Sequence, residues 1–286
     1  MRAVRHALLW LLLAAGSSAA SAANDILDLT YATVGSKALR LDLHLPSGTA
    51  PAPLVIYVHG GAWNAGDKTA YPAFLVASGF AVASVDFRST DEAPFPANVH
   101  DIKAAIRFLR AHAANYGYDG QHIGLSGASS GGHLAALVGV TAGNTALEGT
   151  LGSDTGTSSA VQAIVSWFGA SNLTTILAQS TVFGVGVREP ALRRLLGELP
   201  DKTPELARLA SPVFQVGPGD PPALLLHGDQ DRQMPINQLH ELQGAYEAAG
   251  LPVETLILHG VGHDGGPFFT GAPAARVVAF LRRTLG

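Results

Sequence analysis

The chain has 286 residues, of which 47% are hydrophobic and 14% are charged, so it can bury a substantial core. Its 18 basic and 22 acidic residues give a net charge of -4. No basic block runs along it, which argues against a nucleic-acid partner. The chain has no cysteine, which excludes disulfides and thiol nucleophiles, and its eleven histidines lack metal-ligand spacing such as H-E-x-x-H.

The N-terminus has the pattern of a secretory signal peptide. Two arginines precede an apolar run at 7–15, and small residues follow at 16–23. The sequence Ala-Ser-Ala at 20–22 fits the cleavage pattern, and the apolar run is shorter than the roughly 20 residues of a membrane span. We therefore predict a signal peptide at 1–22 and an exported domain at 23–286. That domain would be periplasmic or secreted and would keep no stable membrane span.

The next part of the sequence predicts a sheet. Stretches 28–34 and 38–45 alternate in part between apolar and polar residues around Gly35-Ser36, which predicts a hairpin at a sheet edge. Short runs that are apolar on both faces follow, as is typical of parallel strands flanked by helices. These runs are residues 54–58, 81–85, 122–126, 161–166, 223–226 and 253–258.

Helical patterns lie between these runs. Asn98 is a candidate N-cap for a helix that reaches about Asn115, and residues 130–142, 235–249 and 273–285 are further predicted helices. The alternation of strands and helices predicts one doubly wound, mostly parallel α/β domain with an N-terminal antiparallel hairpin.

Two stretches interrupt the alternation. Residues 143–160 are rich in Gly, Thr and Ser, and we predict a mobile surface loop there. Residues 169–218 carry only weak helical patches between Gly and Pro. This insertion is either a lid over the sheet or a surface excursion without ligand contact, and the sequence favours neither.

The sequence at 127–131 is Gly-Ala-Ser-Ser-Gly, which matches G-x-S-x-G. This motif forms a sharp turn between a strand and a helix that exposes a nucleophilic serine. The alternative is an ordinary glycine-rich turn, but a predicted strand precedes the motif and a predicted helix follows it. We therefore predict Ser129 as the nucleophile, with the backbone N–H of Ser130 as an oxyanion donor.

The sequence His-Gly-Gly-Ala-Trp at 59–63 follows an apolar strand. Acyl transfer needs preorganised N–H groups for the negative charge on the former carbonyl oxygen. Glycines after a strand let the backbone present such groups, although they would also serve an ordinary turn. With a nucleophile motif downstream, we predict Gly61 and Ala62 as oxyanion donors beside Ser130. Trp63 is a candidate for either the substrate pocket or the core.

A serine nucleophile needs a base, and the base needs an acid to fix its tautomer. Where a G-x-S-x-G turn carries the nucleophile, the acid and then the histidine follow the serine along the chain. Asp229 and Asp231 follow the apolar run at 223–226, and we predict Asp231, the more distal one, as the acid and Asp229 as a brace of the turn. His263 lies in a glycine-rich loop after the last strand, and we predict it as the base.

Together these motifs resemble the esterase/lipase branch of the α/β-hydrolases related to hormone-sensitive lipase. The likeness is strongest to feruloyl-esterase-like and acetyl-xylan-esterase-like carboxylesterases and extends from Leu39 to Leu285. The segments that carry it are HGGAW at 59–63, GDK at 66–68, DFR at 86–88, APFPA at 93–97, SSGGH at 129–133, HGDQD at 227–231 and GVGH at 260–263. The resemblance implies a triad of Ser129, Asp231 and His263, with no metal and no cofactor.

Three positions depart from the pattern of that family. Phe87 stands where tyrosine is usual, Ser130 where alanine is common, and Ala62 in place of a third glycine. None of the three removes a catalytic group, so the departures imply only a pocket of different polarity.

We therefore expect a serine carboxylesterase that hydrolyses small-molecule or polymer-linked esters through an acyl-enzyme intermediate. An amidase or arylformamidase with the same triad is one alternative. A non-catalytic hydrolase-fold binding protein is another, although such proteins usually lose a triad member and all three are present. The sequence does not identify the acyl or alcohol portion of the substrate.

Overall fold

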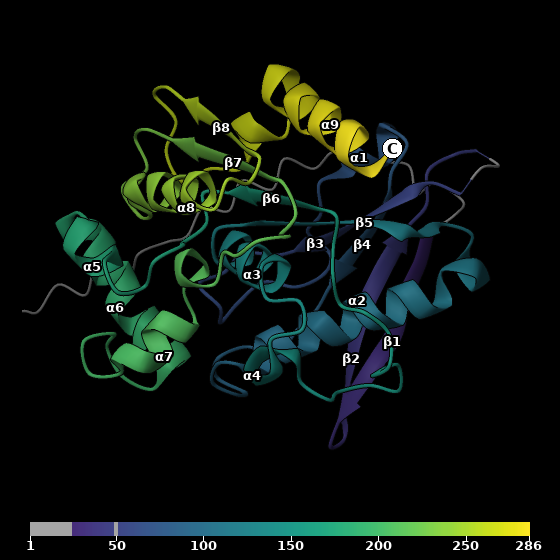
Figure 1. The fold of residues 1–286 in the computed structure, drawn as a ribbon, viewed down its shortest axis with the longest axis horizontal. Coiled ribbons are helices and arrows are strands. Elements are labelled where there is room, and N and C mark those ends of the chain that lie inside the picture. Colours follow the sequence, from purple (N-terminus) through teal and green to yellow (C-terminus); the bar gives the residue numbers. More distant parts are fainter. Residues whose placement is uncertain (1–24, 49–50) are drawn as a thin grey trace, which may run out of the picture.

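A mixed eight-stranded sheet forms the centre of the molecule (Figure 1). The computed structural model describes residues 25–48 and 51–286. In chain order the strands are β1 (Asp25–Val34), β2 (Lys37–His44), β3 (Pro53–Val58), β4 (Ala81–Val85), β5 (Asp119–Ala128), β6 (Ala163–Trp167), β7 (Ala223–Gly228) and β8 (Val253–Leu258). Their order across the sheet is β1-β2-β4-β3-β5-β6-β7-β8. The pairs β1·β2 and β2·β4 are antiparallel, and all others are parallel.

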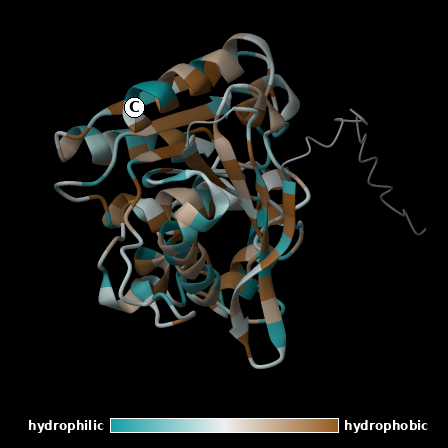
Figure 2. Cartoon of the chain, turned by 90° about the vertical axis from the view of Figure 1, so that its right-hand side faces the viewer, coloured by the Kyte–Doolittle hydropathy of each residue, from teal (hydrophilic) through white to brown (hydrophobic). Residues whose placement is uncertain are grey.

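The strand register divides the buried residues between two cores. Along β3, Leu54, Ile56 and Val58 belong to one hydrophobic cluster, whereas Val55 and Tyr57 belong to the other. Successive side chains of a strand point to opposite faces, so a sheet buried on both sides needs apolar residues at every position. Figure 2 shows hydrophobic residues along the strands of the sheet. The predicted fold class, including the N-terminal hairpin, is confirmed.

Helices cover both faces of this sheet. α2 (Ala97–Tyr116), α3 (Ser130–Gly139) and α8 (Asn237–Ala248) pack on one face, and α1 (Ala73–Ala77) and α9 (Gly271–Leu285) pack on the other. The helix α4 (Thr145–Glu148) is a single short turn. Two 3₁₀ turns, η1 (Pro212–Phe214) and η2 (Gly266–Phe268), complete the described elements.

One local prediction was wrong, and another was incomplete. Asn98 is not an N-cap, because α2 already begins at Ala97 after Pro96, and the Asn98 side chain lies buried inside the helix. The predicted loop at 143–160 contains α4, whose Glu148 forms ion pairs with two cations of α2, Lys103 and Arg107. The start of α2 is set locally, after Pro96, whereas α4 is held by ion pairs to residues distant in the chain, which the sequence pattern does not show.

The insertion at 169–218 contains three helices, α5 (Ile176–Gln179), α6 (Val182–Leu196) and α7 (Pro204–Leu209). Figure 1 shows the three together on the left of the molecule, away from α9. α6 is continuous although it contains two glycines and Pro190, which is why the sequence predicted only weak helical patches there. The two alternatives for the insertion, a lid over the sheet or a surface excursion without ligand contact, both stay predictions.

The predicted signal peptide at 1–22 lies outside the described residues. Within residues 25–48 and 51–286, no helix is long and apolar enough to cross a membrane.

Candidate active site

The serine of the G-x-S-x-G motif stands at a sharp turn between β5 and α3. Ser129 has φ 56° and ψ -122°, a conformation that costs free energy for a residue with a Cβ. Gly131 makes the turn possible: a Cβ there would lie 2.1 Å from the carbonyl oxygen of Val58, at the end of β3. The motif glycine thus lets the nucleophile turn pack directly against the neighbouring strand.

The structure brings together the three predicted triad side chains, which are far apart in sequence. His263 Nε2 lies 2.8 Å from Ser129 Oγ, and His263 Nδ1 lies 2.6 Å from Asp231 Oδ2. A carboxylate only accepts hydrogen bonds, so Nδ1 carries the proton and donates it to Asp231. Nε2 is then free to accept the hydroxyl proton of Ser129, which is the tautomer a general base requires.

Asp231 is fully buried but well supplied with hydrogen bonds. Its Oδ1 accepts the backbone N–H groups of Gln233 and Met234, at 2.9 and 2.8 Å. Its Oδ2 lies 3.3 Å from His227 Nε2, in addition to the bond from His263. Burial by itself would raise the pKa of Asp231, but the hydrogen bonds from His227 and His263 hold that pKa well below its usual range. The carboxylate therefore stays ionised at any pH at which the protein would work.

The alternative acid and base occupy other places. Asp229 accepts hydrogen bonds from His259 Nδ1, at 2.7 Å, and from the backbone N–H of Gly260, at 2.8 Å. The His259 side chain is 88% exposed. This pair links the loop after β7 to the turn after β8, and neither side chain has a hydrogen bond to Ser129.

The predicted oxyanion loop lies against the nucleophile turn. A Cβ on Gly60 would lie 2.9 Å from the carbonyl oxygen of Ala128 and 3.3 Å from Ser129 Cβ, so glycine is required for this approach. The N–H groups of Gly61 and Ala62 donate no hydrogen bond to any described residue. The N–H of Ser130 belongs to the first turn of α3, where such groups lack an intrahelical partner.

The oxyanion loop is held in a strained backbone. Ala62 and Trp63 have φ of 53° and 61°, and such strain persists only where other contacts over-determine the conformation. The carbonyl of Gly61 accepts the N–H groups of Asn64 and Ala65, at 3.0 and 2.9 Å. The indole of Trp63, 1% exposed, donates from Nε1 to His133 Nδ1 at 3.0 Å. These contacts fix the Gly61–Ala62 peptide.

His133 links three parts of the molecule. It stands on α3, accepts from Trp63 of the oxyanion loop, and donates from Nε2 to the carbonyl of Ala210 in the insertion, at 2.7 Å. Burial lowers the pKa of His133 to about 4, so the ring is neutral at pH 7 and can accept from Trp63. The histidine of the SSGGH segment therefore has a clear structural role that its motif alone did not show.

Backbone strain concentrates at this site. Five non-glycine residues of the described chain have positive φ, and four of them lie here: Ala62, Trp63, Ser129 and Phe168. Phe168 packs edge-on against the His263 ring, with centroids 4.7 Å apart. Strain of this kind is common at functional sites because it keeps reacting groups in one geometry.

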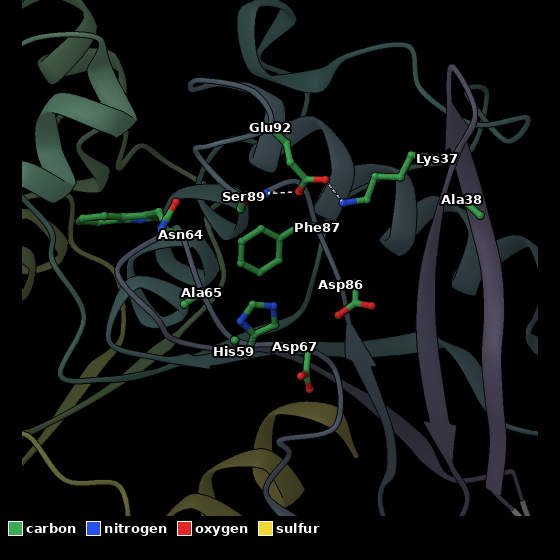
Figure 3. A pocket seen from close by; sticks show the side chains of 12 residues that line it. Lys37, Ala38, His59, Asn64, Ala65, Asp67, Asp86, Phe87, Ser89 and Glu92 are labelled. Carbon is green, nitrogen blue, oxygen red and sulfur yellow. Dashed lines mark hydrogen bonds and ion pairs between the residues drawn. The ribbon is translucent and has the colours of Figure 1, made fainter. Parts of the chain in front are cut away.

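A cavity of about 320 Å³ is lined in part by the oxyanion loop and the residues that follow it (Figure 3). The rings of His59 and Phe87 stack at 4.5 Å within it, and an ion pair between Lys37 and Glu92 closes one side. Ser129 does not line this cavity. Phe87, the departure from the usual tyrosine, is thus placed beside the oxyanion loop and not beside the nucleophile.

Other motif residues hold the framework. Arg88 binds Asp101 of α2 through two guanidinium nitrogens, and the Asp101 carboxylate is fully buried. Within the described residues, no group of three or more His, Cys, Asp or Glu side chains could hold a metal ion.

The mixed sheet, the strained serine turn and the histidine loop after the last strand define an α/β-hydrolase fold. Comparison with known proteins gives the family: the BD-FAE model matches residues 41–246, and the chain belongs to the BD-FAE family. A truncated carbohydrate esterase from gut microbiota is 33% identical, with a TM-score of 0.82, over 92% of this chain and 97% of that one.

Two relatives from Mycobacterium tuberculosis are also similar. Esterase LipC is 33% identical over 247 residues, which cover 82% of this chain and 59% of LipC. Esterase LipQ is 32% identical over 231 residues, which cover 78% of this chain and 53% of LipQ. The chain thus spans between half and three fifths of the length of these two relatives.

Proposed function

We propose that this protein is a serine carboxylesterase. One observation carries the proposal: Ser129, His263 and Asp231 form a continuous hydrogen-bonded chain of 2.8 and 2.6 Å at the carboxyl edge of the parallel strands. That arrangement fits a nucleophile, a general base and an orienting acid. The named esterases among its relatives support the same activity.

The first half-reaction forms an acyl-enzyme. His263 Nε2 takes the proton of Ser129 while Oγ attacks the ester carbonyl carbon, and the carbonyl oxygen becomes an oxyanion. The free N–H groups of Gly61, Ala62 and Ser130 are placed to stabilise that charge, and one such donor is worth about 3 kcal/mol in a comparable enzyme. The carbon–alkoxy bond then breaks, and His263 gives its proton to the leaving alcohol.

The second half-reaction releases the acid. Water gives a proton to His263 and attacks the acyl carbon, and a second oxyanion forms in the same place. Collapse of this intermediate breaks the bond to Ser129 Oγ, which recovers its proton from His263. Asp231 stays ionised throughout and stabilises the imidazolium in both halves.

The proposed substrate class comes from the description of one relative. The gut-microbiota relative is described as a carbohydrate esterase, so acylated sugars are the first substrates to examine, beside simple small-molecule esters. Export is proposed from the charged, apolar and small-residue order at 1–23. Both an acylated polysaccharide and a small ester would be accessible to an exported enzyme.

A hydrolysis panel tests this proposal. Wild-type protein is assayed with acetyl, butyryl, octanoyl and feruloyl esters and with the matching amides. Ser129→Ala should lower kcat by about 10⁴-fold or more, and Asp231→Asn by about 10⁴-fold, because the asparagine favours the wrong tautomer of His263. Asp229→Asn is the matched control and should keep activity within about threefold, since Asp229 only braces a surface turn.

The pH dependence of the panel gives a second measurement. A protonated imidazole cannot accept the serine proton, so kcat should fall towards acid pH if His263 is the general base. Protonation of Asp231 should cause no additional decrease in kcat in this pH range, because the pKa of Asp231 lies well below its usual range. Amide turnover that exceeds ester turnover, or activity that survives Ser129→Ala, would refute the proposed esterase.

A further inference from the structure

A buried arginine in the insertion has no protein partner. Arg188 of α6 is 1% exposed, and its Nε and Nη1 atoms make no hydrogen bond with any described residue. Burial lowers the pKa of Arg188 to about 10, so the guanidinium is still charged at neutral pH. A buried charge without hydrogen bonds is strongly unfavourable, and such a group in a folded protein needs an explanation.

Hydrogen bonds at its two ends fix the course of α6. At the start of the helix, Thr181 Oγ1 donates to the carbonyl of Arg232 in the loop after β7, at 3.0 Å. Near its end, the carbonyl of Leu195 accepts the N–H of Phe95 in the segment after β4, at 3.0 Å. The 15 residues of α6 give a length of about 22 Å, close to the roughly 19 Å of the four strand spacings from β4 to β7.

From these two anchors and this length we infer that the middle of α6 lies above the middle strand of that group. The sheet order between the two ends is β4-β3-β5-β6-β7, so the central strand is β5, which ends next to Ser129. Arg188 is the seventh of the fifteen residues of α6. The helix thus crosses the carboxyl edge of the sheet with Arg188 at its centre.

The side of α6 that carries Arg188 faces the protein. The buried residues of the helix recur at helical spacing: Gly184, Arg188, Ala191, Leu192, Leu195 and Leu196. A Cβ on Gly184, one turn before Arg188, would lie 2.9 Å from the carbonyl oxygen of Arg232, the residue after Asp231. The charge of Asp231 raises the pKa of Arg188 against the opposing effect of burial.

Asp231 does not supply the hydrogen bonds that the Arg188 guanidinium lacks. Its two oxygens already accept from two backbone N–H groups and from the rings of His227 and His263. No ion pair within 4.0 Å joins Asp231 to Arg188 in the described residues. The arginine is therefore near the triad, attracted by its acid, and still has free donors.

The chemistry of these donors selects a ligand class. Each bidentate edge of a guanidinium contains Nη2 and either Nε or Nη1, so each edge of Arg188 includes one unpartnered nitrogen. A planar fork of this kind matches a carboxylate better than a single hydroxyl or a neutral acyl chain. We propose that Arg188 binds a carboxylate carried by the ester substrate, an inference that rests on the proposed esterase activity.

The carboxylate could belong to either half of the ester. An acyl-side carboxylate occurs in the monoesters of dicarboxylic acids, and an alcohol-side carboxylate occurs in esters of hydroxy acids or sugar acids. Two substrate pairs separate these sources. 4-Nitrophenyl hydrogen succinate is compared with 4-nitrophenyl succinamate, and 3-carboxyphenyl acetate is compared with 3-carbamoylphenyl acetate, after subtraction of the enzyme-free rates.

We expect kcat/KM to be at least about tenfold higher for the carboxylate member of one pair, as a charged hydrogen bond in a buried site provides. Arg188→Met should reduce that ratio to near one, and Arg188→Lys should keep part of it. Arg194→Met is the matched control, because Arg194 is an exposed arginine on the same helix, and it should leave the ratio at the wild-type value.

A ratio near one in both pairs for the wild-type protein would overturn the inference without any variant. Retention of the full preference in folded Arg188→Met would also overturn it. Neither result concerns the proposed esterase, which is tested separately by hydrolysis of 4-nitrophenyl acetate with Ser129→Ala as control. Loss of that hydrolysis would refute both proposals, whereas its presence without a carboxylate preference would refute only this one.

Discussion

The nucleophile turn and the insertion meet at the same site but are held by different means. At the turn, close backbone contacts fix the conformation. Gly131 allows α3 to lie against the end of β3, and Ser129 has a positive φ. In the insertion, side-chain contacts hold α6 in position. Thr181 donates a hydrogen bond to the loop after β7, and the apolar side chains of α6 pack in the core. A position fixed by backbone sterics tolerates almost no substitution, whereas a position fixed by side chains can change one contact at a time.

Under the proposed function, this difference would separate the reaction from substrate recognition. The proposed triad and oxyanion donors lie at the sheet edge and on tight turns, where small displacements would be costly for catalysis. If the proposed role of Arg188 holds, the insertion contributes to substrate preference without altering the geometry of the triad.

The largest expected effect is at the turn itself. Gly131→Ala would place a Cβ 2.1 Å from the carbonyl of Val58 and 2.5 Å from that of His59, both of them backbone atoms. We expect a loss of more than about 4 kcal/mol in the free energy of unfolding, or no folded protein. Urea denaturation followed by circular dichroism measures it. A folded variant within about 1 kcal/mol of wild type would contradict the steric interpretation.

The second effect concerns His133, which joins the two regions. Its pKa is lowered to about 4 in the folded protein from the ordinary 6.5, so the unfolded chain binds the proton more readily in this interval. Stability should therefore be fully present above pH 6.5 and should fall by up to about 3 kcal/mol as pH decreases to 4. Urea midpoints of wild type and His133→Gln between pH 7 and 4 measure the difference. An identical pH slope in both proteins would exclude this role for His133.

The third effect tests the clamp on the oxyanion loop. Trp63→Phe removes the indole N–H and leaves His133 Nδ1 without its donor, which we expect to cost about 1–3 kcal/mol of stability. The strained Ala62 peptide should also relax, so that kcat falls while KM changes little. Trp167→Phe is the control for stability, because Trp167 is equally buried and its Nε1 has no partner. A fall in KM and kcat together would argue against a role in transition-state binding.

The smallest effect, and of opposite sign, is expected in the insertion. Gly186 lies within α6, and a Cβ there would meet no atom within 4 Å. Gly186→Ala should therefore stabilise the protein by up to about 1 kcal/mol through helix propensity. Thermal unfolding measures the gain. Destabilisation would show that α6 is not an ordinary helix at this position and would weaken the contrast with Gly131.

Most of the fold could be predicted from the sequence. Runs such as 54–58 are apolar at every position because a parallel strand covered on both sides must be, and that requirement appears directly in the residue pattern. The start of α2 at Ala97 and the ion pairs that hold α4 through Glu148 could not be predicted. Their positions depend on proline geometry and on ion pairs to residues about 40 positions away.

The candidate site also has features that the sequence predicts and features that only the structure shows. Motifs in the sequence predicted Ser129, Asp231 and His263, because each follows a predicted strand whose carboxyl end lies at one edge of the sheet, and the structure brings the three side chains within hydrogen-bond distance. No sequence pattern could show that His133 connects the oxyanion loop to the insertion, or that Arg188 of α6 is buried with unpartnered nitrogens. Those facts arise from packing between segments distant in the chain, which local periodicity and motif spacing do not encode, and only the tertiary structure decides them.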